Sequence, residues 1–185
     1  VCLLALASLL ATSAKAQSCG NDSIYKLPYK NTYVKSTLAA DNEFRTMRPT
    51  YMEIPTFETA KKILPVPIWA GHEKEIEMYW KAWEIGVGNI RNPQPGSGFV
   101  SPYIDTAYNG NIFMWDSAFI LMFARYGERF FPFQKTLDNF YAKQHPDGFI
   151  CREIMANGAD CFERYGPTST GPNLLPWCEM IYYHQ

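Results

Sequence analysis

The sequence has no stretch rich in lysine or arginine. Its 17 basic and 18 acidic residues give a formal net charge of −1, and no basic run is interleaved with aromatic residues. Proteins that bind nucleic acid usually carry a basic patch or stripe on one face. The charge pattern therefore predicts that nucleic acid is not a partner of this chain.

No apolar run is long enough to cross a bilayer, which takes about 20 residues. The longest run covers Cys2 to Thr12, and Ala14-Lys15-Ala16 then supplies the small-x-small pattern of a signal peptidase site. Residues 1–16 are predicted to be a secretory signal, clipped at its start because Val1 is neither a Met nor part of a basic region. The predicted location is export to the periplasm or outside the cell, with no transmembrane segment.

Two other interpretations of the N-terminus stay open. Residues 1–16 could form a buried helix, or Cys19 could carry a lipid anchor. The second interpretation makes the chain a lipoprotein, although Ala16-Gln17-Ser18 lacks the apolar residue that a lipobox has three positions before its cysteine.

Cysteine and histidine are scarce, with five and three residues. Neither residue type shows metal-ligand spacing, so the sequence predicts no metal and no cofactor. Four cysteines remain after the predicted cleavage, and export would allow them to oxidise. Cys151 and Cys161 flank a Gly-containing loop that a disulfide would close, but four thiols allow three pairings and Cys19 and Cys178 also take part.

Aromatic residues are abundant at 16%, and the hydrophobic share is 47% of 185 residues. This length is enough for one medium domain with a real core. Residues 17–70 are rich in Tyr, Pro, Thr and Asn without a sustained period, which predicts an extended lead-in. Residues 71–185 form the predicted domain.

Helical periodicity dominates residues 71–185. The predicted helices begin near residue 73, cover about 116–127 and 132–144, and open again near 174. The first has an apolar stripe, predicted to be core, of Ile76, Tyr79, Trp80, Trp83 and Val87. Helices paired by turns, with irregular loops at one end, indicate a toroid of helical hairpins.

The predicted fold class is all-α, an incomplete (α/α)₆ toroid with an irregular lead-in. About four helices cannot close such a ring. The last predicted helix still runs at Gln185, without a cap or a polar tail. The chain is therefore expected to be truncated at its C-terminus and to expose a large apolar flank.

The most informative stretch runs from Asn111 to Phe119. Asp116 directly follows Trp115 and is hemmed in by apolar residues (Phe113, Met114 and Phe119). A carboxylate in such surroundings loses hydration unless a hydrogen-bond donor replaces the water. Sugar hydroxyls can donate to a carboxylate, and the C–H face of a sugar can lie on an indole. The stretch therefore predicts a carbohydrate-active protein.

Three motifs follow one another along the chain: Trp-Asp-Ser-x-Phe from Trp115, Gln-x-x-Asp-Gly-Phe-Ile from Gln144, and Gly-Pro-Asn-Leu-Leu-x-Trp from Gly171. Their order resembles the first third of the (α/α)₆ glycosidases of clan G, which include trehalases, processing α-glucosidases and mannosylglycerate hydrolases. The resemblance covers residues 75–185. Cys151 stands where the family usually has Pro, and Asn173 stands where it has a second Pro.

The resemblance implies an exported glycoside hydrolase that acts on an α-linked sugar with inversion. Two carboxyl groups about 6.5–9.5 Å apart then serve as general acid and general base. In this family the Trp-Asp element binds hydroxyls of the sugar being cleaved, and the acid and the base come later, beyond residue 185. Asp116 is therefore assigned to substrate binding, with the general acid as its second possible role.

The remaining site assignments come from the same three loops. Phe113 and Trp115 are expected to wall the sugar or to be core. Arg152 and Glu153 are expected to reach sugar hydroxyls or to form a surface ion pair. Asn173 binds a hydroxyl or caps the last helix, and Tyr103 and Asp105 line the mouth of the site.

The leading prediction is a glycoside hydrolase whose partner is an oligosaccharide or glycoside. A non-catalytic protein that captures glycans on the same scaffold is the alternative, and a structural helical protein with an aromatic core is the third interpretation. A downstream pair of carboxylates would separate the first two. Sugar identity and oligomeric state stay open.

Overall fold

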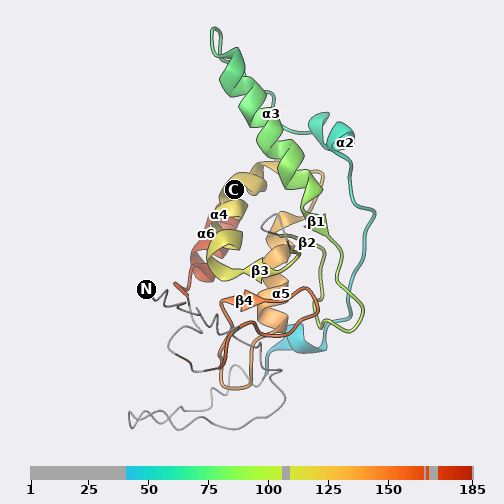
Figure 1. Cartoon of the computed structure of the whole chain (residues 1–185), viewed down its shortest axis with the longest axis vertical. Coiled ribbons are helices and arrows are strands. Elements are labelled where there is room, and N and C mark those ends of the chain that lie inside the picture. Colours follow the sequence, from blue (N-terminus) through green and yellow to red (C-terminus); the bar gives the residue numbers. More distant parts are fainter. Residues whose placement is uncertain (1–40, 106–108, 165, 167–170, 185) are drawn as a thin grey trace, which may run out of the picture.

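The computed structural model describes residues 41–105, 109–164, 166 and 171–184. The predicted signal sequence 1–16, Cys19 and the first part of the predicted lead-in lie outside the described residues. Figure 1 shows one long helix, α3, projecting at one end, with the strands and α5 toward the other end. Helices α4 and α6 contact one another.

The helices largely follow the apolar periodicity. Helix α3 covers Glu73–Gly88 and begins where it was predicted. Helix α4 covers Met114–Ala124 and continues as a 3-10 turn, η2, over Arg125–Gly127. Helix α5, Thr136–Ala142, is shorter than predicted because Phe133–Lys135 form a 3-10 turn, η3. Helix α6 covers Leu175–Tyr183.

The described part of the lead-in, from residue 41 onward, has two short helical turns in an otherwise extended chain. They are η1 (Glu43–Thr46) and α2 (Phe57–Lys61). The extended segment between them is bonded to the body: Thr50 N–H donates to the Val100 carbonyl at 2.9 Å. The Asn92 side chain bonds both the N–H and the carbonyl of Met52, at 3.1 and 2.9 Å.

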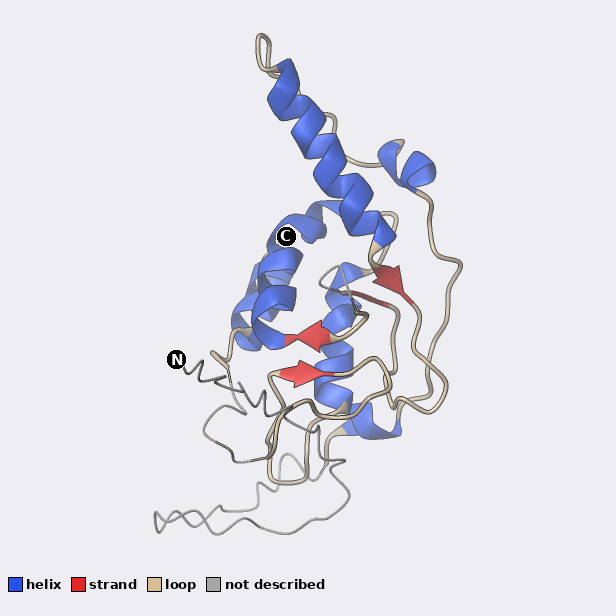
Figure 2. Cartoon of the chain, viewed as in Figure 1, coloured by secondary structure: helices blue, strands red, loops and turns tan. Residues whose placement is uncertain are grey.

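Two antiparallel strand pairs make the fold mixed (Figure 2). Strand β1 (Ile90–Arg91) pairs with β2 (Tyr103–Ile104), and β3 (Ile112–Phe113) pairs with β4 (Glu153–Ile154). The predicted all-α, incomplete (α/α)₆ toroid is therefore wrong. Strands of two residues are too short to show the alternation that predicts a strand. Burial stabilises the second pair, since Ile112 and Ile154 lie opposite one another and are fully buried.

Trp83 of α3 lies at the centre of an aromatic core. Its ring meets Phe123, Phe130 and Phe133 with centroids 5.3, 6.0 and 6.2 Å apart. Trp83 is buried, as are Val87 and the α5 residues Leu137 and Phe140. The prediction that the α3 stripe is core is confirmed at Trp83 and Val87, whereas Ile76, Tyr79 and Trp80 are half-buried.

The buried face of α4 is formed largely by small residues. The small residues Ala118 and Ala124 are fully buried with Leu121, and they allow α4 to approach the core closely. The larger residues Phe119, Met122 and Phe123 are each 38–44% exposed. Helix α6 also exposes Met180 and Tyr183. Large apolar side chains therefore do gather on the outer faces of α4 and α6.

A buried asparagine joins α5 to the segment before β2. The Asn139 side-chain oxygen accepts from the backbone N–H groups of Val100 and Ser101 at 2.8 and 3.1 Å. Its amide donates to the Ser101 carbonyl at 3.0 Å. In the next turn, the Thr136 hydroxyl accepts from Ile104 N–H at 3.2 Å. These contacts satisfy backbone groups that no strand pairs, and they set the position of β2.

Replacing Asn139 with alanine should lower the free energy of unfolding by about 2–4 kcal/mol, because two buried N–H groups and one carbonyl lose their partners. Urea unfolding followed by circular dichroism measures the change. Asn173→Ala is the matched control, because Asn173 is exposed and makes no hydrogen bond with a described residue. Equal stability of the two variants would contradict the role of Asn139.

Gly127 is predicted to tolerate no side chain. A Cβ atom there would lie 2.6 Å from Phe130, 2.8 Å from Phe133 and 2.9 Å from Trp83. Gly127→Ala should lower the melting temperature, at a cost of about 1–3 kcal/mol from overpacking. Gly88→Ala, in the last turn of α3 with nothing within 4 Å of its Cβ position, should leave stability equal or higher. A harmless Gly127→Ala substitution would overturn this account of the core.

Candidate functional site

A pocket of about 340 Å³ lies at the start of α4. It brings together the β3–α4 junction, the residues around the start of β4, and the segment before α6. Five of the eight predicted site residues line it: Phe113, Trp115, Asp116, Arg152 and Glu153. The other lining residues are Phe162, Gly171 and Pro172. Two of these, Gly171 and Pro172, belong to the third motif, and sequence reasoning missed Phe162.

The backbone of the β4 strand fixes the start of α4. No side chain caps this helix at Phe113. Instead, Met114 N–H, the first of the helix, donates to the Arg152 carbonyl at 2.8 Å. The strand register places Phe113 opposite Glu153. Backbone pairing between β3 and β4 therefore brings residues about 40 positions apart to the same pocket.

Asp116 lies in the first turn of α4 and is exposed. The expectation that Phe113, Met114 and Phe119 hem it in is wrong, because Asp116 is exposed, at a pocket that Phe113 also lines. Met114 is buried on the inner side, whereas Asp116 faces the pocket. It forms no hydrogen bond or ion pair with the described residues.

Trp115 presents a flat apolar surface beside this carboxylate. Its side chain is 50% exposed, so the alternative that Trp115 is core is wrong. The ring contacts Phe119 at a centroid distance of 5.5 Å, and Phe119 contacts Trp177 at 6.4 Å. The aromatic row contacts the indole, and half of the Trp115 surface stays exposed to solvent.

Glu153 is held in place by an amide. The Asn111 side chain donates to Glu153 Oε1 at 2.9 Å and accepts from Ala156 N–H at 3.1 Å. Cys161 lies on the same side of the hairpin, and Asn111 also approaches its sulfur at 3.8 Å. Burial, with the nearby Glu153 charge second, raises the pKa of the Cys161 thiol to about 12. Cys151, Cys161 and Cys178 are free thiols, so the disulfide considered between Cys151 and Cys161 is not formed.

Arg152 lies flat on an aromatic ring at the wall of the pocket. Its guanidinium carbon is 3.8 Å from the centroid of Phe162. The Nε atom is buried and forms no hydrogen bond within the described part of the chain. Neither Arg152 nor Glu153 forms an ion pair with a described residue, so the surface-pair interpretation is wrong. Stacking orients the guanidinium and leaves its donors available.

Three predicted site residues lie outside this pocket. Tyr103 is buried and donates to the Gly110 carbonyl at 2.8 Å, and burial, with Asp105 second, raises its pKa to about 12. Asp105 is buried and lies 3.0 Å from Arg91 Nε. Asn173 is exposed, and no side chain caps α6, so the capping alternative is wrong.

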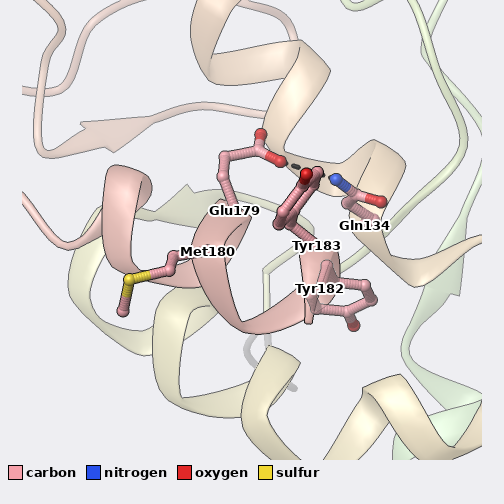
Figure 3. Close-up of a pocket in the computed structure, with 5 residues that line it drawn as sticks. All are labelled: Gln134, Glu179, Met180, Tyr182 and Tyr183. Carbon is pink, nitrogen blue, oxygen red and sulfur yellow. Dashed lines mark hydrogen bonds between the residues drawn. The ribbon is translucent and has the colours of Figure 1, made fainter. Parts of the chain in front are cut away.

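Other polar clusters exist that the local sequence does not predict. His145 Nε2 lies 2.7 Å from Asp160 Oδ2, beside a pocket of about 480 Å³. Another pocket of about 500 Å³ lies at the last turns of α6, where Gln134 donates to Glu179 at 2.6 Å (Figure 3). Tyr141 also donates to Glu179, at 2.9 Å. Both oxygens of Glu179 are thus engaged by the chain itself.

Across residues 41–105, 109–164, 166 and 171–184, no three His, Cys, Asp or Glu side chains gather into a group that could hold a metal ion. None of the helices in these ranges combines the length and the apolar character needed to cross a bilayer.

Comparison of the chain with protein-family models, curated proteins and solved structures found no match. The geometry of the pocket at the start of α4 and the residues that line it are therefore the evidence for function.

Contact between Glu153 and Cys161 predicts a change in thiol reactivity. Glu153→Gln removes a negative charge, so the Cys161 pKa should fall and alkylation by iodoacetamide at pH 8 should become roughly threefold to tenfold faster. Mass spectrometry of the labelled peptide measures the rate. Glu163→Gln, an exposed substitution on the same hairpin, should change nothing. An unchanged rate in Glu153→Gln would show that the two groups are not neighbours in solution.

Proposed function

We propose that the pocket at the start of α4 binds a saccharide, as the substrate-binding part of an exported glycoside hydrolase. One observation carries the proposal: a half-exposed indole, Trp115, stands beside Asp116, a carboxylate without a partner among the described residues, at a concave surface. A sugar ring offers hydroxyl donors to the carboxylate and a C–H face to the indole. The resemblance of the three motifs to clan G glycosidases supports the same substrate class.

Each pocket residue has a distinct part in this proposal. Asp116, in the first turn of α4, offers carboxylate oxygens, which form stronger hydrogen bonds with hydroxyls than neutral acceptors do. Arg152, fixed against Phe162, supplies donors in a planar fork. Glu153, oriented by Asn111, has lone pairs left for a second hydroxyl. The pocket thus offers both acceptors and donors around one aromatic face.

The geometry favours binding over proton donation for Asp116. A general acid in a glycosidase needs a carboxyl group whose apolar surroundings keep it protonated. Asp116 is exposed, so it lacks such apolar surroundings. We therefore expect the acid and the base of hydrolysis to come from outside this pocket. The same observation favours the second candidate function, glycan capture without hydrolysis.

Hydrolysis assays separate the two candidates. The 185-residue chain should bind saccharides but turn over p-nitrophenyl α-glucoside and α-mannoside at no more than the background rate. The protein isolated from its natural source should hydrolyse one of them if it is a glycosidase, and neither if it captures glycans. Rapid turnover by the 185-residue chain would contradict the binding role given to Asp116.

Asp116→Asn and Trp115→Ala test the binding site directly. Loss of a charged hydrogen bond of about 1.5–3 kcal/mol should weaken saccharide binding about 10- to 150-fold in Asp116→Asn. Loss of about 1–2 kcal/mol of apolar contact should weaken it about 5- to 30-fold in Trp115→Ala. Calorimetric titration with trehalose, maltose and α-1,2-mannobiose provides the measurement.

The chain offers matched controls for both variants. Trp69 is 56% exposed and stacks on His72, away from the pocket, so Trp69→Ala should keep full affinity. Asp41→Asn replaces another exposed aspartate. If wild-type protein binds none of these sugars, or if the pocket variants bind as well as the controls, the proposed function is wrong.

A further inference from the structure

A second polar pocket, of about 340 Å³, lies beside the first at the other end of the β3–β4 pair. It is formed by the end of β1, the loop that follows it, the start of β2, and the residues that flank β3 and β4. Its lining is Arg91, Asn92, Gln94, Tyr103, Asn109, Gly110 and Ala156. Tyr103, which the sequence predicts to line the site, contributes here.

A buried acid fixes the cationic group of this pocket. Asp105 has a fully buried side chain and lies 3.0 Å from Arg91 Nε. Arg91 Nη1 donates to the Gly88 carbonyl at 2.9 Å. Nη2 forms no hydrogen bond with a described residue, and 44% of the Arg91 side chain is exposed. The ion pair therefore holds a guanidinium edge toward solvent at the pocket.

Two amide side chains add unused hydrogen-bonding groups. Gln94 is exposed, and its side chain forms no hydrogen bond within the described ranges. Asn109 uses its oxygen to accept from Asn111 N–H at 3.0 Å, and its NH₂ group forms no hydrogen bond with a described residue. A guanidinium edge with two amides provides donors and acceptors for hydroxyl groups without a strong net charge. Such a surface suits a neutral, polyhydroxylated ligand.

Asn111 lies between the two pockets and contacts residues of both. Its side chain bonds Glu153 of the first pocket and the backbone of Ala156 in the second, and its N–H bonds Asn109 of the second. Gly110 of the second pocket precedes Phe113 of the first by three residues, so their Cα atoms lie at most about 11 Å apart. One extended ligand can therefore reach both.

We infer that the second pocket is a further subsite for the same ligand, which is an oligosaccharide rather than a single sugar. This inference depends on the proposed function. One end of the chain lies on Trp115 and Asp116, and the following units pass Asn111 toward Arg91 and Gln94. Asp105 is a positioning residue in this arrangement, since it acts through Arg91.

The test compares affinities along a length series. α-Linked gluco- and manno-oligosaccharides of one, two and four units are titrated into the wild-type chain and into Gln94→Ala, Gln94→Trp and Gln134→Ala. Gln94→Ala should weaken tetrasaccharide binding about 2- to 10-fold and leave the monosaccharide unchanged. Gln94→Trp fills the pocket and should remove the whole gain that length provides. Gln134→Ala is the matched control, an exposed glutamine at the distant pocket of Figure 3.

The outcomes distinguish this inference from the proposed function. Affinity that rises with length, with the rise lost only in the Gln94 variants, supports the second subsite. Affinity that is equal for all lengths, or a rise that Gln94→Trp leaves intact, overturns the subsite and keeps the first pocket. Absence of binding for every length in the wild-type chain overturns the proposed function and the subsite with it. Unchanged melting temperatures show that the variants are folded.

Discussion

The pairing of β3 with β4 is the interaction on which the candidate site depends. Ile112 and Ile154 bury their side chains against the core, while Phe113 and Glu153 of the same register face the pocket. The Met114 N–H bond to the Arg152 carbonyl continues this pairing into α4. Shifting the register by one residue would turn Glu153 inward and Ile154 outward. Burial of two isoleucines thus determines which polar groups meet at the surface.

Buried polar side chains hold the other strand pair, β1–β2, in place. Asn139 and Thr136 of α5 bond the backbone between Val100 and Ile104, which is not paired by regular structure before β2. Asp105 follows directly and fixes Arg91 across β1. Helix α5 thus positions the β1–β2 pair through hydrogen bonds to the backbone that leads into β2. Site geometry and stability are consequently coupled through the same few side chains.

The amino-acid sequence predicted the helices better than the fold class. Helix α3 shows its apolar stripe over four turns, so its start and its buried face could be read from periodicity. Strands of two residues show no period, and the β3–β4 pairing joins residues 42 positions apart, such as Ile112 and Ile154. Local patterns carry no information about such pairings. An all-helical prediction was the result.

The candidate site was predicted only in part, because local sequence patterns do not show contacts between distant residues. Mixed aromatic and polar loops correctly indicated that Trp115, Asp116, Arg152 and Glu153 lie together. The surroundings of Asp116 were not predicted, because residues adjacent in sequence point to different sides of a helix. Phe162 was missed since its role is a cross-hairpin stack under Arg152, and nothing in its local sequence shows that contact.

A crystal structure of the protein grown with maltotetraose or an α-manno-tetrasaccharide tests the central claim most directly. We expect a sugar ring lying on the Trp115 indole, with a hydroxyl about 2.6–3.0 Å from the Asp116 carboxylate. A saccharide bound elsewhere on the protein, or a pocket in which Asp116 turns away from the sugar into an ion pair, would contradict the account.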